Sequence, residues 1–133
     1  MPGYSQSSQA RKLGLTPGMR ISILDAPAHW SLDDPPELEV VGEDVPADIV
    51  LVFLREAASV DERLLALGRR IHPAGALWVA WPRKAAGHVS DVTENLIRDS
   101  VLPHGLVDVK VAAIDEDWSG LKVVWRLSSR GGR

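Results

Sequence analysis

The chain has 133 residues and a net charge of −3, and its 45% hydrophobic and 25% charged fractions are typical of one soluble globular domain. It contains no cysteine, so disulfides, thiolate nucleophiles and cysteine-bound zinc are excluded. The acidic balance gives no electrostatic footprint for DNA or RNA, and no apolar run approaches the roughly 18–20 residues that cross a bilayer.

The N-terminal stretch "MPGYSQSSQARKLG" has no apolar core of the signal-peptide kind, so we expect a cytoplasmic protein. Residues 1–16 are expected to form a helical arm, with Ser5 as the cap of a short helix and Gly14 closing it in a left-handed conformation. "TPGM" then predicts a type II turn with Pro17 and Gly18 at its centre, directly before a strand in "MRISILD".

The next segment, "APAHWSLDDPPE", is a link bounded by Pro27 and Pro35. Proline disfavours helix for itself and for its predecessor, so at most two helical turns fit between them. "LEVVGED" predicts a short strand. "ADIVLVFL" has six consecutive apolar residues, Ile49–Leu54, a run typical of a strand covered on both faces.

Two helices follow, separated by a strand in "GALWVAWP". The first lies in "SVDERLLALGRRIHPAG", where Ser59 and Glu62 predict a capping box. The second lies in "VTENLIRDSVL", with a capping box from Asp91 and Glu94 or, as an alternative, Ser90 as the cap.

The last two strands, "LVDVKVAAID" and "LKVVWRL", alternate apolar and polar residues, which indicates one solvated face near a sheet edge. In the second strand, Leu121, Val123, Trp125 and Leu127 are expected on one face. The connector "EDWSG" is short enough to predict an antiparallel hairpin. Residues 128–133 are expected to form a flexible tail.

Together these elements predict a single α/β domain over residues 1–133. Helices between apolar strands imply right-handed crossovers and a three-layer, mostly parallel α/β sheet, with the antiparallel hairpin at one edge.

The pattern resembles a trimmed methyltransferase fold. "ADIVLVFL" resembles the fourth strand of Rossmann-like methyltransferases, and "RRIHPAGALWVAWP" resembles their helix, turn and fifth strand. In that family, S-adenosylmethionine lies over the first strand, the glycine loop and helix after it, and an acid at the end of the second strand. Asp25 matches the acid that ends the first strand, and Glu43 could match the second. Pro27 stands where backbone freedom is needed, so no cofactor is predicted, with S-adenosylmethionine as the alternative.

The chain is also similar, over nearly its whole length, to a bacterial family of small proteins defined by a domain of unknown function. "KLGLTPGMR", "GALWVAWPRKAAG" and "LPHGLVDVKVAAIDEDWSGLK" carry this resemblance. It implies no activity and no catalytic residues.

Ligands of open parallel sheets bind outside the carboxyl ends of the strands, and polar and aromatic residues gather there in this sequence. The candidate ligand-binding residues are Asp25, Trp30, Arg55, Arg83, Lys84, His88, Asp115 and Trp118. Trp118, expected in the hairpin turn, could wall a pocket, anchor a partner or fill the vacated cofactor groove, and we favour the last role for it and for Trp30. No histidine spacing indicates a metal site.

We therefore expect a non-catalytic protein that binds a partner protein or a small ligand at the carboxyl edge of its sheet, with a homo-oligomer as one form. The alternative is a small-molecule enzyme, either a reduced S-adenosylmethionine-dependent methyltransferase or a catalyst that uses Asp25, His88 and Lys84. A weaker alternative is an anion-binding module centred on Arg83 and Lys84, which are otherwise solvated surface cations.

Overall fold

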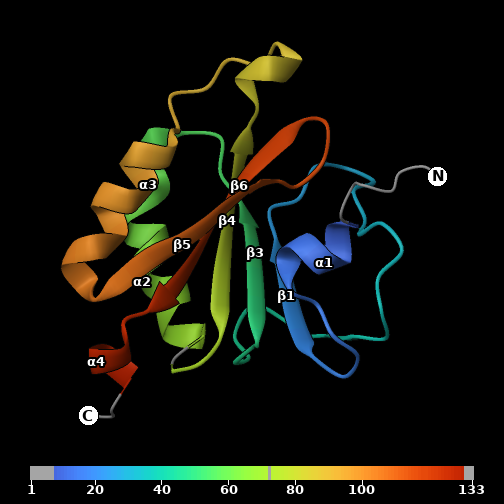
Figure 1. The fold of residues 1–133 in the computed structure, drawn as a ribbon. Coiled ribbons are helices and arrows are strands. Elements are labelled where there is room, and N and C mark those ends of the chain that lie inside the picture. The colour runs from blue at the N-terminus through green and yellow to red at the C-terminus, as the bar shows by residue number, and fades with distance from the viewer. Residues whose placement is uncertain (1–7, 72, 131–133) are drawn as a thin grey trace.

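A six-stranded sheet runs through the part of the chain that the computed structural model describes, residues 8–71 and 73–130 (Figure 1). Its strands are β1 Arg20–Leu24, β2 Glu39–Val40, β3 Ile49–Phe53, β4 Ala76–Pro82, β5 Leu106–Ala113 and β6 Trp118–Trp125. They lie in the order β2-β1-β3-β4-β6-β5; β1 to β4 are parallel, and β6 is antiparallel to both β4 and β5. The predicted fold class, with a C-terminal antiparallel hairpin at one edge, is confirmed.

The two faces of the sheet are covered differently. The helices are α1 Gln9–Leu13, α2 Val60–Ile71, α3 Glu94–Val101 and α4 Leu127–Arg130, with 3-10 turns η1 Ala57–Ser59, η2 Lys84–Ala86 and η3 Leu102–His104. α2 and α3 pack side by side on one face, whereas α1 lies on the other (Figure 1). The link between β1 and β2 completes the cover of this second face.

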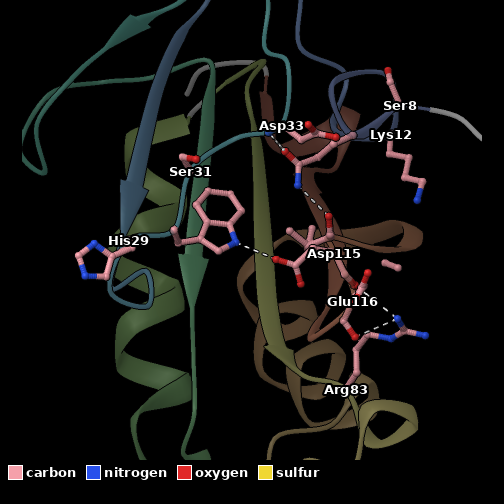
Figure 2. Close-up of a pocket in the computed structure, with 12 residues that line it drawn as sticks. Ser8, Lys12, His29, Ser31, Asp33, Arg83, Asp115 and Glu116 are labelled. Atoms are coloured by element: carbon pink, nitrogen blue, oxygen red, sulfur yellow. Dashed lines mark hydrogen bonds between the residues drawn. The ribbon is translucent and has the colours of Figure 1, made fainter.

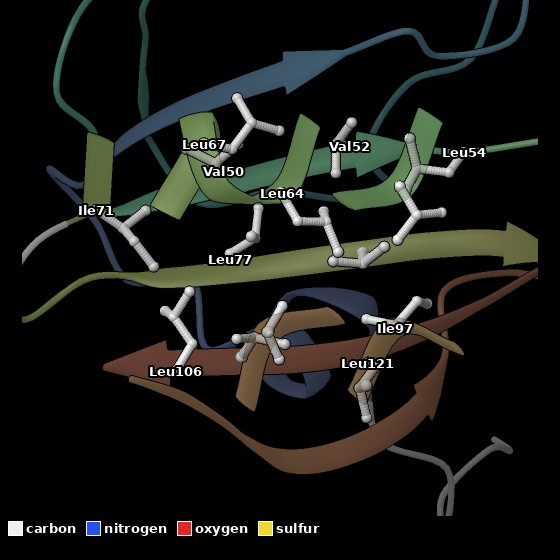
Figure 3. Packing of buried hydrophobic residues seen from close by; sticks show 14 of the residues in the cluster. Val50, Val52, Leu54, Leu64, Leu67, Ile71, Leu77, Ile97, Leu106 and Leu121 are labelled. Carbon is white, nitrogen blue, oxygen red and sulfur yellow. The ribbon is translucent and has the colours of Figure 1, made fainter. Parts of the chain in front are cut away.

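The larger core lies between the sheet and the two long helices. Leu64 and Leu67 of α2 pack over Val50 and Val52 of β3 and over Leu77 of β4 (Figure 3). All five residues of β3 are buried, because the helices cover one side of this strand and the α1 layer covers the other. The continuous apolar run of β3 therefore does indicate a strand buried on both faces.

The proline-bounded link, residues 25–38, is described over its full length and contains no helix. Asp25 and His29 adopt left-handed φ angles of 61° and 64°, which cost a non-glycine residue on the order of 1 kcal/mol each. Trp30 and Leu38 turn inward and pack on the apolar cluster of the second face. The link therefore covers the sheet with irregular backbone and apolar side chains where a crossover helix would otherwise lie.

The start of the α2 helix contains a 3-10 turn that the sequence did not predict. The extended residue that precedes the helical segment is Glu56, and the 3-10 turn η1 leads directly into α2. Ser59 is the last residue of this turn, and its side chain lies outside the described part of the structure, so the predicted capping box with Glu62 stays a prediction.

The start of α3 also differs from the prediction. Thr93 is the N-cap, and its hydroxyl accepts a hydrogen bond from the Leu96 N–H at 3.1 Å. Asp91, expected as the cap, instead accepts from the Ala57 N–H at 2.8 Å, so its carboxylate serves the turn that leads into the other helix. Ser90, the alternative cap, donates to a carbonyl beyond the end of β3.

Short helices lie near both ends of the described chain. The α1 helix is capped by Ser8, because the expected cap Ser5 lies outside the described residues, and Gly14 closes it at φ 75° as predicted. Leu13 is 1% exposed, so the described part of the expected arm packs against the core. At the C-terminus, α4 occupies residues where a tail was predicted, and Leu127 within it is 79% exposed, so Leu127 does not continue the apolar face of β6.

Candidate functional site

Three aromatic rings, hereafter the aromatic stack, lie together at the carboxyl end of β3. Phe53 ends this strand, and the Trp30 and Trp118 rings each pack edge-to-face against it with centroids 4.9 Å away. Trp118 is 8% exposed and is the first residue of β6 rather than a turn residue, which corrects the sequence-based placement. The rings fill the space between the link and the hairpin.

Asp115 holds the hairpin turn to the link. One of its carboxylate oxygens accepts the Trp30 indole N–H at 2.8 Å (Figure 2). The other accepts the backbone N–H groups of Asp117 and Trp118 at 2.8 and 2.9 Å. With three bonds made to the protein itself, this carboxylate is a structural brace for the aromatic stack.

Arg83 braces the same turn from β4. Its guanidinium donates to the carbonyls of Asp115 and Glu116 at 3.4 and 3.2 Å (Figure 2). Its backbone N–H donates to the Asp117 carbonyl. Lys84 is exposed and lines, together with Arg83, a separate cavity of about 390 Å³. Arg83 is therefore bonded to the hairpin turn, whereas Lys84 is a surface cation, and the two do not act as the expected pair.

Arg63 joins the two acids that matched the methyltransferase pattern. Its guanidinium donates to the Asp25 carboxylate at 2.8 Å and to the Glu43 carboxylate at 3.1 Å. Burial by itself lowers the pKa of Arg63, but the hydrogen bonds and charges of Glu43 and Asp25 outweigh burial, and the pKa is raised. We name Asp25, Arg63 and Glu43 the arginine clamp.

The sequence offered only a weak signal for the arginine clamp. Arg63 lies three residues after Val60 and one before Leu64, both buried, so it borders the apolar stripe of α2 that faces the sheet. That position aims its long side chain towards the carboxyl ends of β1 and β2. The acids it binds are 38 and 20 residues away in sequence, beyond the reach of local patterns.

A pocket of about 470 Å³, hereafter the edge pocket, opens between the link, β3, β4 and the hairpin turn. Its lining residues are Pro27, Arg55, Pro82, His88, Val89, Asp117 and Trp118. The Arg55 guanidinium carbon lies 5.1 Å from the centroid of the Trp118 ring, and Nη1 donates to the Asp25 carbonyl at 3.0 Å. Arg55 is thus held in place from two sides at the carboxyl end of β3.

A histidine and an aspartate pair at the rim of the edge pocket. The His88 Nε2 lies 2.9 Å from the Asp117 carboxylate, and the two side chains are 43% and 62% exposed. Ser90 donates to the Arg55 carbonyl at 2.9 Å and so ties the segment that carries His88 to β3. Asp117 therefore joins the candidate residues, although the sequence suggested only a solvated charge there.

A second, broader depression of about 750 Å³ lies between α1, the link and the hairpin turn, and both Trp30 and Asp115 line it (Figure 2). Gln9 spans its floor, donating to the Ile114 carbonyl at 2.8 Å and accepting from the Asp33 N–H at 2.7 Å. Charges of both signs line it, including Lys12. Its polar groups connect elements of the fold and do not converge on one point.

Within residues 8–71 and 73–130, no three side chains of the His, Asp and Glu types come together as a metal would require. Among the described helices, none is long and apolar enough to span a membrane.

Solved structures with the same fold share little sequence with this chain. A protein in the NADB-Rossmann superfamily from Streptococcus agalactiae gives a TM-score of 0.54 at 9% identity, covering 90% of this chain and 68% of the other. The B. subtilis M1A22 tRNA methyltransferase TrmK gives 0.53 at 11%, over 89% of this chain and 64% of TrmK. A LepI variant in complex with SAH and a substrate analogue gives 0.53 at 12%, over 88% of this chain and 39% of LepI.

The fold is that of Rossmann-like methyltransferases. At such low identities the likeness establishes the fold and not the activity. The chain spans less than two thirds of the length of the TrmK and LepI structures. No protein-family model and no curated protein sequence matches it.

The residues at the carboxyl edge do not fit S-adenosylmethionine in the position that the family resemblance implies. The arginine clamp has a guanidinium bonded to Asp25 and to Glu43, the acid that a ribose would need. The Trp30 side chain, packed on Phe53, fills the region above the first strands, and the link provides no helix N-terminus.

The fold brings most of the predicted residues together in two groups. Arg55, His88 and Trp118 line the edge pocket, and the Asp25 carbonyl accepts a hydrogen bond from Arg55. Trp30, Arg83 and Asp115 bond or pack around the hairpin turn. Lys84 stands apart from both groups. Arg63 and Phe53 were not among the predicted site residues.

Proposed function

We propose that this protein is a non-catalytic α/β domain that binds a small ligand in the edge pocket. One observation carries the proposal: the aromatic stack fills the space beside β1 and β3 where the fold family holds its cofactor, while the edge pocket next to it stays open. An apolar groove without a ligand would expose a large patch, and the two tryptophans close it.

The edge pocket has the size and lining of a ligand site. Its volume of about 470 Å³ lies within the range of about 300–1,000 Å³ typical of small-molecule pockets. Pro27, Pro82 and Val89 contribute apolar groups to the lining, and Arg55 and His88 contribute polar groups. This mixture of apolar walls with a few placed polar groups favours a small organic molecule.

Methyl transfer is the alternative, favoured by the fold itself and by the presence of a tRNA methyltransferase among the similar structures. The arginine clamp and the aromatic stack argue against it. A catalyst built from Asp25, His88 and Lys84 is disfavoured because the Asp25 carboxylate is bonded to Arg63, and Lys84 does not line the edge pocket.

The other alternative is that the same edge binds a protein partner or a second copy of this chain. Sedimentation velocity over a range of protein concentrations tests the self-association. We also propose that the protein is cytoplasmic and that it belongs to the bacterial family of small proteins named above.

Thermal unfolding in the presence of candidate ligands tests the proposal. The panel contains S-adenosylmethionine, S-adenosylhomocysteine, nucleotides, phosphate and a set of small organic acids, amides and amines. A ligand at one hundred times its Kd stabilises by about 2.7 kcal/mol, which gives a clear shift in Tm. We expect a shift with a small organic ligand and none with S-adenosylmethionine. A shift with S-adenosylmethionine alone would favour methyl transfer instead.

A further inference from the structure

We propose that the edge pocket binds a small carboxylic acid with an apolar body, and that Arg55 receives the carboxylate. This inference rests on the proposed function, because it names the ligand class of the same pocket. Four properties support it: the preorganisation of Arg55, and the charge balance, apolar walls and volume of the pocket.

Arg55 is arranged as an anion receptor before any ligand arrives. The Trp118 ring supports its guanidinium at 5.1 Å, and the Asp25 carbonyl accepts one of its N–H groups at 3.0 Å. The Arg55 guanidinium carries five N–H donors. Among the described residues, the Asp25 carbonyl is the acceptor that binds one of them. The remaining donors form a planar fork that matches a carboxylate, and little side-chain entropy is left to lose on binding.

The charges around Arg55 favour a single negative charge on the ligand. The nearby Asp25 carboxylate is bonded to Arg63, and the Asp117 carboxylate is bonded to His88 on the pocket rim. Among the described residues that line the pocket, Arg55 is therefore a cation with no carboxylate bonded to it. A phosphate dianion would meet one arginine and the Asp117 charge, so a monoanion is the better match.

The walls favour a hydrocarbon body. Pro27 and Pro82 have no backbone N–H to offer, and Val89 stands at the rim with 97% of its surface exposed. A flat or branched apolar group placed against them would remove this surface from water. A volume of about 470 Å³ suits an acid of the size of phenylacetate or somewhat larger.

Protein-observed NMR with a matched probe set tests the ligand class. The probes are phenylacetate, phenylacetamide, phenethylamine and phenyl phosphate, which share one ring and differ in the polar group. We expect phenylacetate to perturb the amides around the edge pocket in a saturable way and to bind about tenfold or more tightly than phenylacetamide.

Substitutions identify the receptor. Arg55→Gln should weaken phenylacetate binding about tenfold or more, and Arg55→Lys, which keeps the charge but loses the fork, should weaken it less. Arg69→Gln, on the exposed surface of the last turn of α2, removes the same charge far from the pocket and should leave binding unchanged. Unchanged amide spectra away from the pocket establish that each variant is folded.

The outcomes separate the two proposals. Equal binding of the acid and the amide, preference for phenyl phosphate, or full binding by Arg55→Gln would overturn the ligand class while leaving a small-ligand pocket. If no probe and no member of the wider panel perturbs the edge pocket, the proposed function fails together with this inference.

Discussion

The indole N–H of Trp30 donates to a carboxylate oxygen of Asp115 at 2.8 Å, joining two residues 85 positions apart in the chain. The other carboxylate oxygen of Asp115 accepts two backbone N–H groups of the hairpin turn. One carboxylate therefore fixes the turn and, through Trp30, the link that covers β3. This bond places the aromatic stack where a methyltransferase fold would leave room for its cofactor.

Asp115→Ala should lower the free energy of unfolding by about 1–3 kcal/mol, because it leaves the part-buried Trp30 N–H without its acceptor and the hairpin turn without its brace. Urea unfolding at equilibrium measures the loss. Glu116→Ala, which removes an exposed neighbouring carboxylate, is the matched control and should change stability by less than about 0.5 kcal/mol. Equal effects from both variants would contradict the role given to Asp115.

Trp118→Ala should destabilise the protein by about 3–5 kcal/mol, since this residue is 8% exposed and its ring packs on Phe53. Trp118→Phe keeps an aromatic edge on Phe53 and should cost less. Val89→Ala, at a residue 97% exposed, is the control and should be nearly neutral. If Trp118→Ala unfolds at the same urea concentration as the wild type, the ring does not fill the cleft.

The arginine clamp should contribute modestly and depend on salt. All three side chains are partly exposed, so the coupling energy between Arg63 and Asp25 should be about 0.2–1 kcal/mol and should shrink at high ionic strength. A double-mutant cycle with Arg63→Gln and Asp25→Asn, at low and high salt, measures it. A coupling that exceeds about 2 kcal/mol or ignores salt would contradict a screened pair.

The pH dependence of the clamp follows from the raised pKa of Arg63. A cation whose pKa rises on folding contributes stability that is fully present below its unfolded pKa and is lost only as the pH passes above it. For arginine that loss falls in strong alkali. The Arg63 charge should therefore contribute equally at neutral and mildly alkaline pH, and the cycle above should return the same coupling at both.

Thr93 and Asp91 should affect different helices, although they are two residues apart. Thr93→Ala removes the cap of α3 and should cost about 0.5–2 kcal/mol, with faster amide exchange at Leu96. Asp91→Ala should instead speed exchange at Ala57, whose N–H bonds the Asp91 carboxylate. Faster exchange at Leu96 in the Asp91 variant would restore the capping box expected from sequence.

Local patterns were sufficient for most of the fold. The apolar run of β3 and the glycine that closes α1 each act through neighbouring residues, so the sequence predicts them well, and the short connector predicts the antiparallel hairpin. The alternating pattern of β5 is less faithful: Val109 and Val111 are 53% and 51% exposed, and the pairing register shifts between Asp108 and Lys110. The helix starts were less predictable, because several residues near position 91 can cap a helix. A donor from another segment, the Ala57 N–H, determines which partner Asp91 takes.

The candidate site was predictable in place but not in detail. The rule that ligands bind at the carboxyl ends of parallel strands located Arg55, His88 and Trp118 on one pocket. It did not reveal that Arg63 bonds Asp25, or that Asp115 serves Trp30, because these contacts join segments 38 and 85 residues apart. Such pairings depend on the folded geometry, which no periodicity in the sequence encodes.

The most direct test is an NMR titration with S-adenosylmethionine that follows the Trp30 indole N–H signal. It asks whether the aromatic stack fills the carboxyl edge of the sheet. Because this N–H is bonded to Asp115 and its ring packs on Phe53, we expect the signal to stay unmoved up to millimolar ligand. A saturable shift of this signal, accompanied by shifts at Asp25 and Glu43, would contradict this account. It would mean that the protein binds S-adenosylmethionine at the carboxyl edge.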